Sequence, residues 1–127
     1  MNLALWTAAA LLAVVALTGG ITKTFVSKDT LAAFHGGGWT GDVGVGFVKT
    51  LGVLELLAAL GLILPAALAV APVLVPVTAV CWVVLMIGAM ITHGRRGEFA
   101  LAGLNLIYLA LAAFIAWGRF GPWAFTA

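Results

Sequence analysis

Charged side chains are scarce in this sequence. Only 8% of the 127 residues are Asp, Glu, Lys or Arg, whereas soluble domains carry about 25%. Hydrophobic residues make up 65%, and the mean hydropathy is +1.24. These values exclude an ordinary soluble domain and predict one membrane domain. The net charge is only +2, and basic residues in such a chain are best explained as topology signals, so we expect no nucleic-acid partner.

Cysteine and cofactor motifs are also nearly absent. Cys81 is the single cysteine, which excludes an intramolecular disulfide and a CxxC redox pair. His35 and His93 lie far apart in sequence, and neither has metal-ligand spacing, so we expect no metal site. The chain has no Walker, Rossmann, GxSxG or haem-attachment motif. No covalently held cofactor is implied, and a role that depends on a partner is favoured over a self-sufficient oxidoreductase.

Four apolar runs are long enough to cross a hydrocarbon core about 30 Å thick. They cover residues 3–21, 47–64, 73–92 and 99–117. Pro65 is expected to end the second run, because proline cannot continue a helix without loss of a hydrogen bond. The pattern predicts an all-α, integral membrane four-helix bundle that forms a single domain over residues 1–127.

The first run has an alternative interpretation as a cleaved signal peptide. No Lys or Arg precedes it, and it is longer than a usual signal-peptide core, so a membrane span is favoured. Ala16 and Gly20 within it form a small-xxx-small pair, which would let another helix approach closely.

The connection after the first span, residues 23–46, mixes charges, aromatic residues and glycines. Ser27 is a suitable N-cap, and residues 27–34 are expected to form a short amphipathic helix at the membrane interface. Three consecutive glycines then break the helix. Trp39 suits the headgroup level.

Basic residues indicate the orientation of the chain. Three lie in or beside the first connection and two in the third, whereas the second connection has none. These residues are Lys23, Lys28, Lys49, Arg95 and Arg96. Since basic loops stay in the cytoplasm, we expect both connections there and both termini outside, in a bacterial inner membrane. Lys49, Arg95 and Arg96 have the simpler alternative of snorkelling to the interface.

Two polar residues are expected at the same depth inside different spans. Glu55 in the second span and Asn105 in the fourth each lie roughly 10 Å from the same membrane face by helix rise. Tyr108 is one turn beyond Asn105 on the same helix face. Lys49 is six residues from Glu55, which is not a helix-neighbour spacing, so Glu55 needs a partner from another helix.

A buried polar cluster is therefore predicted at one end of the bundle. Glu55 is expected to meet Lys23 from the first span and Asn105 from the fourth, near a ligand-sized gap. Either this cluster fixes helix packing through a buried ion pair, or it handles a substrate or proton. The candidate site comprises Lys23, Glu55, His93, Arg96, Asn105 and Tyr108.

Three segments resemble the DoxX-like family of small bacterial membrane proteins. They read LTGGITKTF, FVKTLGVLELLAALGLILP and MITHGRRGEFALAGLNLIYLALAAFIAWGRF. The most specific pieces are the small-residue turn before Lys23, the G-x-L-E-x-L pattern around Glu55, and the T-H-x-R-R-G-E turn followed by Asn105.

The resemblance implies a four-helix membrane bundle and places Lys23, Glu55, His93, Arg96 and Asn105 in a common site. Relatives include a subunit of a thiosulfate-oxidising enzyme that passes electrons to quinone, and proteins that assemble partner enzymes or receptors at the membrane. One function is therefore a membrane subunit of a redox system, with a quinone or other apolar small molecule bound in the cytoplasmic half. The alternatives are a non-catalytic anchor or assembly factor and a lipid-modifying enzyme. Either main role implies a partner protein or a homo-oligomer.

The orientation can be tested with single cysteines in a Cys81→Ala background. In spheroplasts, we expect an impermeant maleimide to label Ala69→Cys, in the uncharged second connection, and to leave Lys28→Cys unlabelled until the membrane is opened. Strong labelling of Lys28→Cys in sealed spheroplasts would contradict the orientation while leaving the four spans intact.

Overall fold

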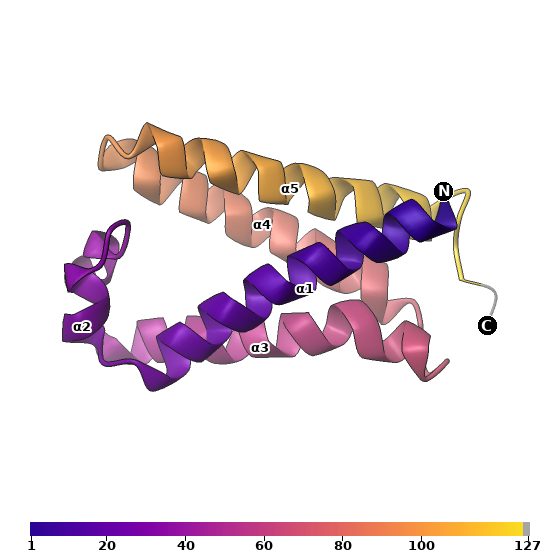
Figure 1. Cartoon of the computed structure of the whole chain (residues 1–127), viewed down its shortest axis with the longest axis horizontal. Coiled ribbons are helices and arrows are strands. Elements are labelled where there is room, and N and C mark those ends of the chain that lie inside the picture. The colour runs from indigo at the N-terminus through magenta and orange to yellow at the C-terminus, as the bar shows by residue number, and fades with distance from the viewer. Residues whose placement is uncertain (126–127) are drawn as a thin grey trace.

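The computed structural model describes residues 1–125, within which it contains helices and no strand. Its elements are α1 (Asn2–Phe25), α2 (Lys28–Ala33), the 3₁₀ helix η1 (Gly38–Asp42), α3 (Val45–Ala67), α4 (Leu74–Arg95) and α5 (Phe99–Phe120). The four long helices are each long and apolar enough to cross a membrane. The predicted all-α, four-span bundle is therefore confirmed (Figure 1).

The expectation that Pro65 ends the second span is wrong, because α3 continues to Ala67. A proline in the last helical turn removes only one backbone donor, and its fixed φ suits a helix. The backbone amide groups of Leu68 and Val70 still donate to the carbonyl oxygens of Leu64 and Pro65, at 2.8 and 2.9 Å. The final turn is therefore completed around the proline.

The short helix predicted over residues 27–34 is confirmed as α2. Ser27 is its N-cap, and the Ser27 side-chain oxygen accepts a hydrogen bond from the backbone N–H of Thr30 at 3.3 Å. Asp29 lies in the first turn, where a negative charge is favourable. Gly36 follows with φ of +79°, a left-handed conformation that turns the chain toward η1.

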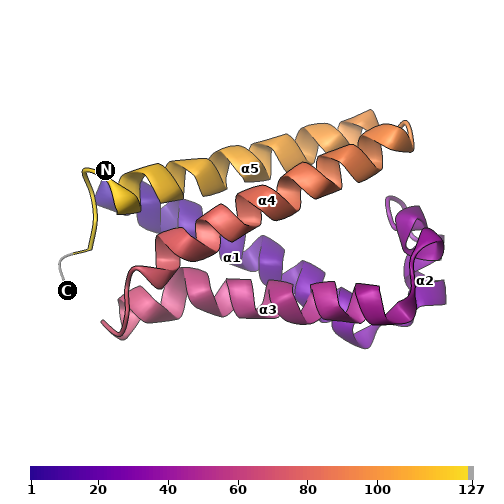
Figure 2. The same cartoon turned by 180° about the vertical axis from the view of Figure 1, so that it is seen from behind.

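The four long helices form two antiparallel pairs that meet at one end of the molecule. Helices α4 and α5 lie side by side, and α3 lies against the second half of α1 (Figure 1). Helix α1 runs diagonally, so its first half reaches α5. The pairs converge near the two termini and diverge at the end that carries α2 and η1, as the reverse view also shows (Figure 2). We call these the convergent and divergent ends.

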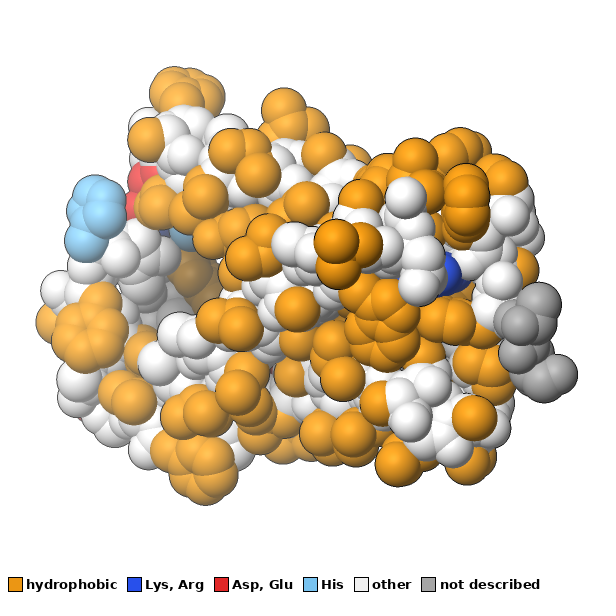
Figure 3. Space-filling view, turned by 45° about the vertical axis from the view of Figure 1, so that its right-hand side comes forward, with side chains coloured by type: hydrophobic (Ala, Val, Ile, Leu, Met, Phe, Trp, Pro, Cys, Tyr) orange, Lys and Arg blue, Asp and Glu red, His pale blue; other side chains and the backbone are white. Residues whose placement is uncertain are grey.

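The apolar core fills the convergent half of the bundle. Each long helix contributes a fully buried side chain, from Leu12, Leu62, Val75 and Ile115. The outer surface is also apolar, as the space-filling view shows (Figure 3). A helix bundle that is hydrophobic both inside and outside matches a lipid solvent.

Small residues allow α1 and α3 to pack with their backbones in close contact. A Cβ atom added to Gly20 would lie 2.9 Å from the backbone nitrogen of Leu56, and one added to Gly52 would lie 2.7 Å from that of Thr24. The close approach predicted for the Ala16–Gly20 face of α1 is thus confirmed for Gly20. These contacts bring the end of α1 against the middle of α3.

Gly52→Ala should destabilise the bundle by about 1–3 kcal/mol, because the new methyl group must push two backbones apart. The matched control is Gly103→Ala, whose added Cβ meets nothing within 4 Å. That variant should unfold like the wild type or slightly later. Thermal unfolding in detergent checks both, and wild-type stability of Gly52→Ala would contradict the close packing.

Candidate functional site

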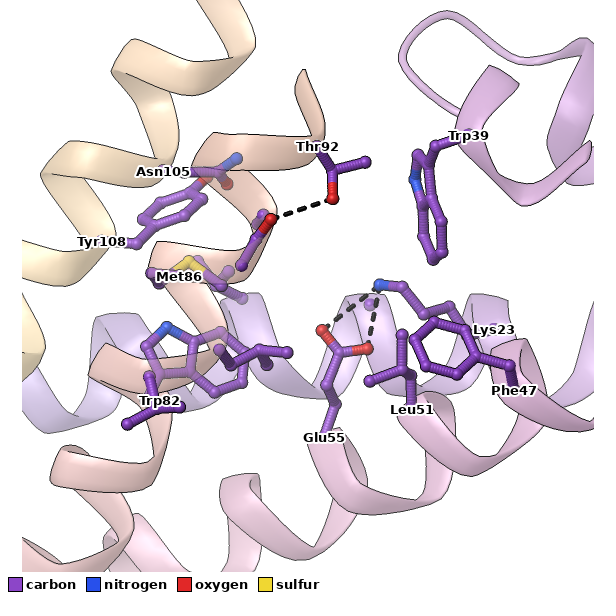
Figure 4. Close-up of a pocket in the computed structure, with 16 residues that line it drawn as sticks. Lys23, Trp39, Phe47, Leu51, Glu55, Trp82, Met86, Thr92, Asn105 and Tyr108 are labelled. Atoms are coloured by element: carbon purple, nitrogen blue, oxygen red, sulfur yellow. Dashed lines mark hydrogen bonds and ion pairs between the residues drawn. The ribbon is translucent and has the colours of Figure 1, made fainter. Parts of the chain in front are cut away.

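A cavity of about 490 Å³ lies at the divergent end, between the α1–α3 pair and the α4–α5 pair. Side chains from all four long helices and from η1 line it. The polar and aromatic members are Lys23, Trp39, Phe47, Glu55, Trp82, Thr92, Asn105 and Tyr108 (Figure 4). Most of the remaining wall is aliphatic. The cavity therefore combines an apolar body with a few polar groups, as small-molecule sites commonly do.

An ion pair joins two helices at the wall of this cavity. The ammonium nitrogen of Lys23, near the end of α1, lies 2.9 Å from Oε2 and 3.2 Å from Oε1 of Glu55, in the middle of α3. The side chain of Glu55 is 8% exposed and that of Lys23 is 21% exposed. A Cβ atom at Gly19 would lie 3.2 Å from each partner, so the glycine leaves room for the pair. Glu55 is thus neutralised from α1.

Two buried polar atoms on this wall have capacity for another hydrogen bond. Within residues 1–125, Nε1 of Trp82 and Nδ2 of Asn105 are buried without a hydrogen-bond partner. Both oxygens of Glu55 are instead held by the Lys23 ammonium, at 2.9 and 3.2 Å. Figure 4 shows Trp82 and Asn105 across the cavity from Lys23. Because a buried unpaired polar group costs about 1–3 kcal/mol, this arrangement favours a polar ligand.

The helix η1 covers the divergent end and is fastened there by charged groups. Trp39 of η1 lines the cavity. Asp42 at the end of η1 accepts a 2.6 Å hydrogen bond from Arg96, which also lies 3.2 Å from Glu98. The imidazole Nδ1 of His93 is 3.0 Å from the same Glu98 carboxylate. That hydrogen bond, with the charge of Arg96, holds the pKa of the Glu98 carboxyl below its usual range.

The predicted site residues divide into two groups. Four line the cavity, namely Lys23, Glu55, Asn105 and Tyr108. His93 and Arg96 do not line it and instead belong to the cluster with Glu98 and Asp42. No hydrogen bond joins Glu55 to Asn105 in the part of the chain that the structure describes, because the cavity lies between them. The functional role of all six residues stays a prediction.

Trp39 and Trp82 line the cavity but were not predicted from the sequence as site residues. Trp82 is 2% exposed and lies in the middle of α4, away from the interfacial position that tryptophan favours in membrane helices. A buried indole N–H group needs a hydrogen-bond partner, so the position of Trp82 in the middle of an apolar span could have indicated a polar site there. Trp39 lies in η1, and it lines the cavity because the connection between α1 and α3 folds back toward the bundle. No local sequence pattern predicts that fold.

Glu55→Ala should lower the free energy of unfolding by about 3–5 kcal/mol, because it leaves the Lys23 ammonium without its counter-charge. Adding Lys23→Met should recover most of that loss. Lys49→Met is the control, since among residues 1–125 Lys49 donates only to the backbone carbonyl of Val26, at 2.7 Å, and this substitution should cost about 1 kcal/mol or less. A double-mutant cycle in detergent measures the coupling, and strictly additive effects of Glu55→Ala and Lys23→Met would contradict the pairing.

Neither the curated proteins nor the solved structures contain a match to this chain. The sequence does match the DoxX-like family over residues 7–115. The matched region extends from the first half of α1 into α5, so it includes every residue named above as lining the cavity. The chain therefore belongs to the DoxX-like family, as a membrane protein with four apolar, membrane-spanning helices.

Proposed function

We propose that this protein binds a lipid-soluble small molecule of the quinone class in the cavity at the divergent end, as a membrane subunit or accessory protein of a redox system. The supporting observation is one cavity that combines apolar walls, the Lys23–Glu55 pair, and the unpaired N–H groups of Trp82 and Asn105. The volume, about 490 Å³, is within the range of small-molecule sites, about 300–1,000 Å³.

The donor set suits a quinone headgroup. A quinone carries two carbonyl oxygens on opposite sides of a flat apolar ring, and both accept hydrogen bonds. The Lys23 ammonium can donate to one oxygen, and Asn105 on the other side of the cavity can donate to the second. Met86, Leu85 and Leu51 supply apolar surface for the ring.

Glu55 adds a group that can hold a proton beside the ligand. Reduction of a quinone to a quinol takes up two electrons and two protons, so a nearby carboxylate is useful chemistry. The Glu55 carboxylate lines the cavity with the Lys23 ammonium 2.9 Å away, so the pair can exchange a proton with a bound ligand. Lys23 would stabilise negative charge that develops on the adjacent carbonyl oxygen. The sequence carries no redox cofactor motif, so the electrons are assigned to a partner protein.

The distribution of charge supports a cytoplasmic position for the divergent end in a bacterial inner membrane. The basic residues Lys23, Lys28, Lys49, Arg95 and Arg96 all belong to elements at that end. Arg119, near the end of α5, belongs to the convergent end together with both termini. This asymmetry follows the positive-inside rule, with both termini outside. A partner enzyme in the cytoplasm would meet α2 and η1.

Quinone binding can be measured by quenching of the tryptophan fluorescence in nanodiscs, because Trp39 and Trp82 line the cavity. Decylubiquinone should quench saturably. Asn105→Leu should weaken decylubiquinone binding about tenfold or more, since it removes a donor contact worth about 1.4 kcal/mol. Glu55→Gln should weaken decylubiquinol binding by a similar factor, because the hydroxyl group of the quinol donates to the carboxylate charge that this variant removes. Thr18→Val, at an exposed position of α1, is the matched control and should bind like the wild type.

The same experiment separates ligand binding from a purely structural role. Wild-type stability with weakened quinol binding in Glu55→Gln supports the proposal. Loss of stability in Glu55→Gln that Lys23→Met rescues, without saturable quinone binding by the wild type, would assign the pair to helix packing. The protein would then be better explained as a membrane anchor or assembly factor for a partner protein.

A further inference from the structure

A second hollow lies beside the cavity, on the outer surface between α3 and α4. It has a volume of about 380 Å³, and apart from Thr78 and Cys81 its wall is apolar. We call it the α3–α4 groove. Leu51, Trp82 and Leu85 belong to the walls of both the groove and the cavity. The two spaces are therefore neighbours that share one partition of three side chains.

The groove follows from the way α3 and α4 cross. Gly61 and Thr78 bring the helices together, since a Cβ atom on Gly61 would lie 2.5 Å from the Thr78 hydroxyl oxygen. From that contact the helices diverge toward η1 (Figure 2). On α3 the groove extends from Leu51 to Ala58, about 10 Å by helix rise. It is thus narrow at the Gly61 contact and meets the cavity at its wider end.

The aqueous side of the cavity is bordered by η1. Trp39 of η1 lines the cavity at the divergent end, and the 2.6 Å contact between Asp42 and Arg96 fastens η1 to the α4–α5 turn. On the groove side, Leu54 and Leu57 line the hollow and are 55% and 57% exposed. A ligand that is already dissolved in the bilayer can therefore reach the groove without displacing η1.

We propose that the α3–α4 groove is a lateral portal from the bilayer and holds the apolar chain of the ligand whose polar head lies in the cavity. This inference rests on the function proposed for the cavity. It specifies the ligand class further, as an amphipathic molecule with one flat polar head and a single flexible alkyl or prenyl chain. Trp82 and Leu85 lie where the head joins the chain.

The distribution of polar atoms supports this assignment of head and chain. The Lys23–Glu55 pair and the unpaired N–H groups of Trp82 and Asn105 belong to residues that line the cavity. In the groove, the Thr78 hydroxyl already donates to the backbone carbonyl of Leu74 at 2.6 Å. A polar head would gain hydrogen bonds only in the cavity, whereas an apolar chain loses nothing in the groove.

Cys81 provides the test, because it is the only cysteine, is exposed, and lies on the groove wall. Protein alkylated at Cys81 with N-benzylmaleimide should bind decylubiquinone about tenfold or more weakly in nanodiscs, because the benzyl group fills space that the decyl chain needs. Ubiquinone-0, which has no chain, should bind as before. The control is the same label on Ile87→Cys in a Cys81→Ala background, since Ile87 is exposed on α4 and lines neither space.

A second variant narrows the groove without chemical modification. Ala58→Leu enlarges a side chain on the groove wall and should also weaken the binding of decylubiquinone but not of ubiquinone-0. Ala110→Leu, at an exposed position of α5, should leave the binding of both quinones unchanged. Equal weakening of both quinones, or no change in either, would overturn the portal while leaving the cavity site in place. Failure of both quinones to bind the wild type would overturn the proposed function and this inference with it. A Cys81–Cys81 disulfide formed between copies in native membranes would assign the groove to a second copy instead.

Discussion

The structure depends on neutralising one carboxylate in the apolar part of a helix. Glu55 has no cation at a helix-neighbour position of α3, so its partner has to come from elsewhere. Lys23 reaches it because Gly20 and Gly52 let α1 and α3 approach to backbone contact. The glycine contacts and the ion pair are therefore one feature, because a larger residue at either glycine would separate the charges that make Glu55 tolerable in lipid.

This close contact also determines where space remains. Helix α1 packs on α3 at Gly20 and on α5 at Gly118, where an added Cβ atom would lie 2.6 Å from the side chain of Leu5. Helices α3 and α4 meet at Gly61. With contacts fixed at these points, the two helix pairs separate toward the divergent end, and the cavity forms there. The polar side chains of Lys23, Glu55 and Asn105 therefore line a space between the two helix pairs, where no glycine contact among residues 1–125 joins one pair to the other.

Features with a local cause could be predicted from the sequence. The four spans follow from apolar length, the Ser27 cap from its side chain, and the presence of Glu55 and Asn105 at one end of the bundle, where both line the cavity, from helix rise. Features that depend on helix rotation or on the loop path could not. His93 and Arg96 are at the divergent end but outside the cavity, because they contact Glu98 and Asp42 instead. Trp39 reaches the cavity only because η1 folds over the divergent end.

The structural and ligand-binding interpretations of Glu55 are compatible because the ion pair and the unpaired donors lie on different sides of the cavity. Both oxygens of Glu55 lie within 3.2 Å of the Lys23 ammonium nitrogen, which is the contact that a role in helix packing needs. A cluster that served only to join helices would gain stability from further donors to this carboxylate. Trp82 and Asn105, the two unpaired donors, instead lie beyond the intervening cavity (Figure 4). This spacing leaves the stabilising contact intact and keeps the remaining hydrogen-bonding capacity for a molecule between them.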